Sequence, residues 1–299
     1  MLTLDQFSQE VASRITGMLD ADVEVSLKKI VKNNDITLTG LIIQPRNSNI
    51  APTIYMEGYY DDYKGLYNMD EILTRIVKVA NENMADMPFD VESITSLEKC
   101  RDWIVPRLIN TEMNRNLLDS RPHKEIADLS ITYAILLDRH GEVTAAVPVT
   151  YQLMEQWGIS CDELYELAIE NQVNAEKSVI MSMKEVLKGL MSEDTGINND
   201  IEGDTPEIYI LSNETKVNGA AAVLDKRFMD DVIDRVGERF YILPSSIHEV
   251  LVVPDKGGVE KDMLESMVRE VNGSTVSTEE QLSDHVYIYN KKEGLKLAV

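Results

Sequence analysis

The sequence predicts an α+β protein with mainly antiparallel sheets, helices packed on them, and two modules. Two stretches, 22–57 and 127–149, alternate apolar and polar residues on either side of short turn-rich segments, which is typical of β-hairpins. The last third follows the order β-β-α-β-β-α-β, which favours a compact α+β module. Amphipathic helices with apolar residues spaced by three and four surround these strands.

The N-terminal region, 1–191, begins with a helix whose apolar residues recur at helical spacing: Leu4, Phe7, Val11, Ile15 and Met18. Thr3 and Gln6 form a capping box in front of it. "VEVSLKKIV" and "ITLTGLII", joined by the turn-rich "KNND", predict the first hairpin, and "APTIYME" adds a third strand. Asn68 and Glu71 then open a second amphipathic helix.

The second hairpin follows an edge strand in "DWIVPRLIN", since Pro106 cannot donate to a strand ladder. "ADLSITYAILLD" and "VTAAVPV" flank the turn "RHGE" and form that hairpin. Gly158 ends the next short helix because glycine tolerates the left-handed position at a helix end. Ser160 and Glu163 open the helix after it.

An acidic, turn-rich segment at 192–206 predicts a linker or loop between two modules. The C-terminal module, 207–299, contains two predicted helices, "KRFMDDVIDRV" and "VEKDMLESMVREV". Its predicted strands are "IYIL", "GAAAVL", "FYIL", "HEVLVV" and "HVYIYN".

Composition narrows the class of partner. The 29 basic and 52 acidic residues give a formal net charge of −23, which repels phosphate backbones and anionic lipid heads. We therefore expect no nucleic-acid and no membrane partner. The two cysteines form no CxxC pair, and the N-terminus has no secretory pattern, so we expect a cytoplasmic protein. Neither a Walker A loop nor GxGxxG is present, so the sequence predicts no cofactor.

"LPSSIHEVLVVP" at 243–254 carries the residue types of a catalytic centre. Ser246, His248 and Asp284 are the candidate hydrolase residues, because a serine nucleophile needs a base and an orienting carboxylate. His248 and His285 are candidate metal ligands. Against both hypotheses, GxSxG and HExxH are absent, and residues 248 and 249 would point to opposite faces of a strand.

Four tyrosines gather in "GYYDDYKGLYNMDE": Tyr59, Tyr60, Tyr63 and Tyr67. Tyrosine supplies rigid amphipathic area, so this cluster is the candidate contact surface for a partner. An ordinary core edge explains it as well.

Several blocks resemble a known family. "KNNDITLTGLII", "EQWGISCDELYELAIEN", "YILPSSIHEVLVVP" and "VREVNGSTVSTEEQLSDHVYIYN" are similar to those of uncharacterised gut-Firmicutes proteins catalogued as the domain of unknown function numbered 5688. The resemblance covers nearly the full length apart from the acidic segment near residue 200. It implies an intracellular bacterial protein and no site residue.

No motif satisfies the geometric requirements of chemistry, so the sequence favours a non-catalytic binding or regulatory protein over an enzyme. Its partner is expected to be a protein or a small ligand. The alternative is a hydrolase using Ser246, His248 and Asp284, assisted by a metal at His285. A third hypothesis, drawn from the net charge, is a mimic of an acidic polymer.

Overall fold

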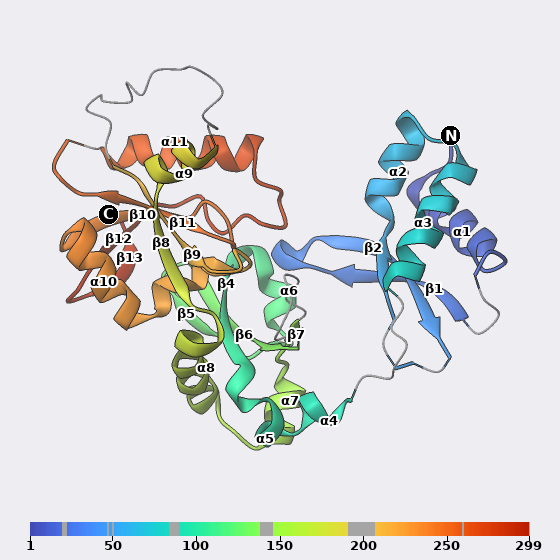
Figure 1. Ribbon diagram of the computed structural model, residues 1–299, viewed down its shortest axis with the longest axis horizontal. Coiled ribbons are helices and arrows are strands. Elements are labelled where there is room, and N and C mark those ends of the chain that lie inside the picture. The colour runs from blue at the N-terminus through green and yellow to red at the C-terminus, as the bar shows by residue number, and fades with distance from the viewer. Residues whose placement is uncertain are drawn as a thin grey trace. The chain divides into compact units, whose positions relative to one another are not determined.

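The computed structural model describes residues 1–19, 23–46, 48–49, 51–83, 90–137, 146–190, 207–258 and 260–298. These residues form two compact units, Met1–Val91 and Glu92–Val299 (Figure 1). Each unit has its own hydrophobic core. Both units combine helices with antiparallel sheets, which confirms the predicted α+β class. No helix within the described ranges is both long and apolar enough to cross a membrane.

The first unit packs three helices on a three-stranded sheet of order β1-β2-β3. Its elements are α1 (Leu4–Ile15), β1 (Val23–Val31), β2 (Thr37–Pro45), β3 (Thr53–Tyr55), α2 (Met56–Gly65) and α3 (Met69–Asn83). β1 and β2 pair antiparallel from Val23 opposite Pro45 to Val31 opposite Thr37, which confirms the first hairpin. The capping box of Thr3 and Gln6 is also formed.

The second unit contains the helices and strands that follow Val91. Its helices are α4 (Glu92–Thr95), α5 (Leu97–Cys100), α6 (Arg115–Leu118), α7 (Tyr151–Trp157), α8 (Cys161–Ala175), α9 (Met183–Leu190), the 3-10 helix η5 (Gly219–Leu224), α10 (Lys226–Val236) and α11 (Lys261–Ser274). Its strands are β4 (Ile104–Asn110), β5 (Lys124–Ile126), β6 (Leu129–Leu136), β7 (Ala146–Pro148), β8 (Ser178–Ser182), β9 (Tyr209–Asn213), β10 (Arg239–Leu243), β11 (Val250–Pro254), β12 (Tyr287–Asn290) and β13 (Gly294–Leu297).

The smaller sheet of this unit has the order β4-β6-β5, with β7 also paired to β6. The antiparallel pairing of β6 with β7 confirms the second hairpin, although its turn lies outside the described residues. Every residue of β4 and β6 is buried, because both faces of these strands are covered. Pro106 lies on β4, the strand that ends this sheet's order, as predicted for a residue without a backbone N–H.

The larger sheet has the order β13-β12-β10-β11-β9-β8, and all its neighbours are antiparallel. β8, which was not predicted, pairs with β9 from Ser178 opposite Asn213 to Ser182 opposite Tyr209. The predicted linker 192–206 lies outside the described residues. The strands on either side of it, β8 and β9, share one sheet, and the two compact units meet in the sequence after Val91.

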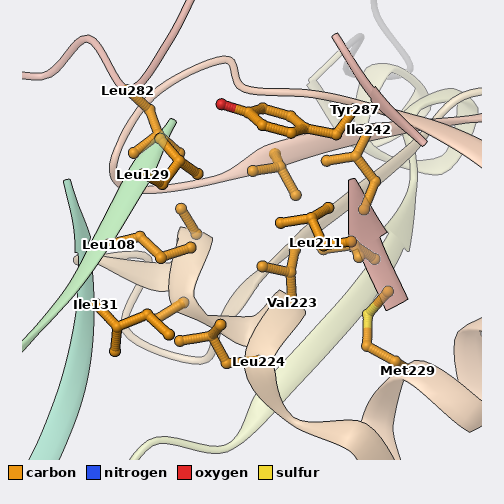
Figure 2. Packing of buried hydrophobic residues seen from close by; sticks show 14 of the residues in the cluster. Leu108, Leu129, Ile131, Leu211, Val223, Leu224, Met229, Ile242, Leu282 and Tyr287 are labelled. Atoms are coloured by element: carbon orange, nitrogen blue, oxygen red, sulfur yellow. The ribbon is translucent and has the colours of Figure 1, made fainter. Parts of the chain in front are cut away.

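The core of the second unit lies between its two sheets (Figure 2). Leu108 and Ile131 of the smaller sheet belong to the same cluster as Leu211 and Ile242 of the larger sheet. η5 fills the space between them, and all six of its residues are buried. The predicted strand "GAAAVL" is therefore wrong: small residues let this segment wind tightly inside the core, where a strand would need a ladder partner.

Candidate functional site

Ser246 and His248 lie in the loop that joins β10 to β11. The Ser246 Oγ accepts a hydrogen bond from the His248 backbone N–H at 3.0 Å, so this hydroxyl is bonded to main chain and not to the imidazole. The backbone N–H of Asn218 donates to His248 Nδ1 at 3.1 Å. That bond occupies the ring's acceptor nitrogen, which places the proton on Nε2, 3.5 Å from Glu280 Oε1.

Asp284 is not brought to these residues. Its carboxylate accepts a hydrogen bond from Asn272 Nδ2 at 2.8 Å, and no bond among the described residues joins it to Ser246 or His248. The predicted serine hydrolase arrangement thus lacks both the nucleophile–base bond and the base–carboxylate bond. The loop before β11 is instead bonded to the start of η5 through Asn218 and to β9 through Ser212, whose hydroxyl donates to the His248 carbonyl at 2.8 Å.

His285 lies against a different carboxylate, that of Asp128, the residue just before β6. Asp128 Oδ2 is 2.9 Å from His285 Nδ1 and accepts from the Ser283 hydroxyl at 2.8 Å. Its Oδ1 accepts from the Tyr287 hydroxyl at 2.6 Å. Figure 2 shows the Tyr287 hydroxyl pointing toward the side of the core where Leu129 lies, next to Asp128 in the chain.

These donors set the ionisation of the cluster. Burial alone raises the pKa of Asp128, but the hydrogen bonds from His285, Tyr287 and Ser283 outweigh it and hold that pKa below its usual value. Burial, together with the charge of Asp128, raises the pKa of Tyr287 well above its ordinary range. Asp128 therefore stays ionised, and Tyr287 stays protonated, at neutral pH.

The Asp128–His285 pair has the form of an oriented base, because a carboxylate on Nδ1 leaves Nε2 to accept a proton. The His285 side chain is 51% exposed, and no hydroxyl or thiol contacts Nε2 within the described part of the chain. The pair therefore lacks a nucleophile of its own. Its evident effect is to tie the segment before β12 to the smaller sheet.

The two candidate metal ligands, His248 and His285, are each paired with a carboxylate and not with one another. His248 and His285 each lie near a single carboxylate, Glu280 and Asp128 respectively. Within the residues that the structure describes, no group of three or more His, Cys, Asp or Glu side chains is arranged to hold a metal ion.

The tyrosine cluster lies in and after α2, in the first unit. Phe7 of α1 stacks obliquely on Tyr60 and Tyr63, with ring centroids 5.5 Å and 5.1 Å apart. Arg75 of α3 lies over the rings of Tyr59 and Tyr67, at 5.4 Å and 4.7 Å from their centroids. Tyr59, Tyr60 and Tyr63 pack against the core that α1, α2 and α3 help to form. Tyr67 is the most exposed of the four tyrosines, at 40%.

A groove of about 490 Å³ lies between α8 and the start of α10 in the second unit. The α8 wall carries Tyr165 and Ile169, which are half-buried, and the exposed carboxylates Glu166 and Glu170. Residues four apart lie on one helix face, so an apolar stripe runs beside an acidic stripe. Neither carboxylate has an ion-pair partner among the described residues.

The α10 wall of this groove is cationic. Lys226 and Arg227 occupy the first turn of α10, are exposed, and have no ion-pair partner in the described part of the chain. Asp225, the N-cap, accepts hydrogen bonds from the backbone N–H groups of Arg227 and Phe228 at 3.0 Å and 3.1 Å. Its carboxylate is thus engaged by the helix backbone.

A family model described as a family of unknown function (DUF5688) matches residues 4–291. The chain belongs to the DUF5688 family. This match confirms the resemblance inferred from the sequence. No curated protein and no solved structure matches the chain.

Sequence reasoning on this DUF5688 protein missed Asp128, Ser283, Tyr287 and the groove. Ser283, His285 and Tyr287 stand at alternate positions, which in extended chain project to one side. That spacing was an available signal. Their acceptor lies 155 residues before Ser283, a separation that only the fold closes.

Proposed function

We propose that this protein acts by binding a small or peptide ligand in the groove between α8 and α10, and not by catalysis. The observation that carries the proposal is the groove itself, of about 490 Å³ with unpaired charges on both walls. Ligand sites are typically clefts of roughly 300–1,000 Å³ with an apolar lining and a few polar groups. Tyr165 and Ile169 supply the apolar surface here, and four charged side chains supply the polar groups.

The chemistry of the polar clusters supports binding over turnover. His248 accepts a backbone hydrogen bond on Nδ1, and Ser246 is bonded to main chain. His285 is oriented by Asp128, but no hydroxyl or thiol of the described chain contacts its Nε2. The net charge of −23 favours neither nucleic acid nor anionic lipid as the partner, so a cytoplasmic protein that binds a soluble ligand is the function we propose.

The test is a methyl NMR titration that observes Ile169 and Val173, which both line the groove. The probes are a panel of amino acids, short peptides, nucleotides and sugar phosphates. We expect at least one class to shift these two methyl signals in a saturable manner. The double substitution Lys226→Ala with Arg227→Ala should weaken that response, whereas Lys292→Ala, at an exposed lysine outside the groove, should not.

The proposal fails if no class of the panel moves the Ile169 and Val173 signals. It fails equally if the responding signals lie away from the groove, or if the Lys292 variant loses binding to the same extent as the groove variant.

A further inference from the structure

The floor of the groove has a defined length. Tyr165, Ile169 and Val173 follow one another at intervals of four residues along α8, so their side chains form one stripe. Eight residues of α-helix rise about 12 Å. An extended peptide advances at most about 3.3–3.6 Å per residue, so three to four residues cover this stripe.

The two walls carry opposite charges. Glu166 and Glu170 lie on α8, and Lys226 and Arg227 lie on α10; none of them has an ion-pair partner among the residues described. A purely anionic ligand would meet the two carboxylates of α8, and a purely cationic ligand would meet the two cations of α10. A ligand with one group of each sign satisfies both walls.

A peptide also suits a further polar group of the groove. Asn174 lies at the groove beside the apolar stripe and is exposed. Its amide offers both a donor and an acceptor, which matches the C=O and N–H of a peptide bond. A single amino acid carries both of its charges on one carbon and covers only about 3.5 Å of the floor.

We propose that the groove binds a short peptide of three to four residues with a free ammonium at its N-terminus and a free carboxylate at its C-terminus. This inference rests on the proposed binding role. The ammonium pairs with Glu166 and Glu170, the carboxylate pairs with Lys226 and Arg227, and an apolar side chain lies on Tyr165.

The test compares four forms of one probe, the tripeptide Ala-Leu-Ala: free, N-acetylated, C-amidated, and blocked at both ends. Binding to the full-length protein is followed by the Ile169 and Val173 methyl signals and by calorimetry. We expect the free peptide to bind, and each single block to weaken binding about tenfold or more, because each removes a charge-assisted hydrogen bond. The doubly blocked peptide should show the weakest binding.

Substitutions assign each end of the peptide. In the double variant Lys226→Ala with Arg227→Ala, C-amidation should no longer weaken binding relative to the free peptide, whereas N-acetylation should still weaken it. Glu166→Gln with Glu170→Gln should do the reverse. Lys292→Ala and Glu155→Gln, at exposed positions outside the groove, serve as controls and should leave both effects unchanged.

The outcomes separate the two proposals. If the doubly blocked tripeptide binds as tightly as the free one, the peptide termini are not recognised and the zwitterion inference is overturned. If nucleotides or sugar phosphates move the groove signals and no peptide does, the binding role stands and the peptide inference falls. If nothing in the panel moves them, both fall.

Discussion

Asp128 shows how one side chain connects distant parts of the second unit. Its two carboxylate oxygens accept from Ser283 and His285, which precede β12, and from Tyr287, the first residue of β12. Asp128 itself directly precedes β6 of the smaller sheet and follows Ala127, whose φ of 56° lies in the left-handed region. A partly buried carboxylate with three donors is well compensated, so the cluster stabilises the contact between the two sheets.

Replacing Asp128 with Asn removes the charge that these donors recognise. We expect the free energy of unfolding of the second unit to fall by about 1–3 kcal/mol at neutral pH. The folded-state pKa of Asp128 is lowered, so its contribution is fully present above the unfolded-state pKa of about 4 and is lost as pH falls through the folded-state value. The gap between wild type and Asp128→Asn should therefore narrow in acid.

Denaturant unfolding followed by tryptophan fluorescence measures this gap. Both tryptophans of the chain, Trp103 and Trp157, lie in the second unit and pack against its core, so fluorescence reports that unit. A gap of constant size from neutral to acid pH would contradict the assigned role of the carboxylate.

At the scale of elements, η5 is the fully buried segment at the centre of the second unit's core. It lies between the two sheets, and its residues reach into the shared core with Leu211 of β9 and Met229 of α10. Its first residue, Gly219, faces main chain at very short range. A Cβ there would stand 2.6 Å from the Asn213 backbone nitrogen and 2.7 Å from the His248 carbonyl oxygen.

Gly219→Ala should therefore destabilise the second unit by about 1–3 kcal/mol, since backbone atoms must move to accept the methyl group. Gly273 is the matched control. It lies near the end of α11, and a Cβ there meets nothing within 4 Å, so Gly273→Ala should be neutral or stabilise by up to about 1 kcal/mol. The same fluorescence-detected unfolding compares them, and equal losses for both variants would show that close packing at η5 is not the cause.

At the scale of the whole molecule, the chain contains two units with separate cores. Phe7, Leu41 and Ile72 belong to the core of the first unit, and among the described residues that core ends at Ala80. The second unit is larger, at Glu92–Val299, and contains the polar clusters and the groove. Two cores without shared residues are expected to unfold with their own midpoints.

Unfolding should accordingly look different to two probes. Far-UV circular dichroism reports helices and strands of both units, whereas tryptophan fluorescence reports the second unit alone. We expect the dichroism curve to contain a transition that the fluorescence curve lacks. Superimposable curves would mean that the two units unfold as one cooperative body.

The sequence by itself determined the features whose causes are local. Capping boxes at Thr3 and Ser160, the left-handed Gly158 and the alternation of β1 and β2 each depend on residues a few positions apart, and each is present in the structure. His285 was singled out for the same reason, as a polar residue before an apolar strand.

Tertiary structure decided the rest, because long-range burial overrides local preference. Small residues became η5 and not a strand once two sheets enclosed them. Asp128 became the partner of His285 only when folding brought together segments more than 150 residues apart. The groove has no sequence signature, since its acidic wall and its cationic wall belong to two helices, α8 and α10, that β8, α9, β9 and η5 separate in the sequence.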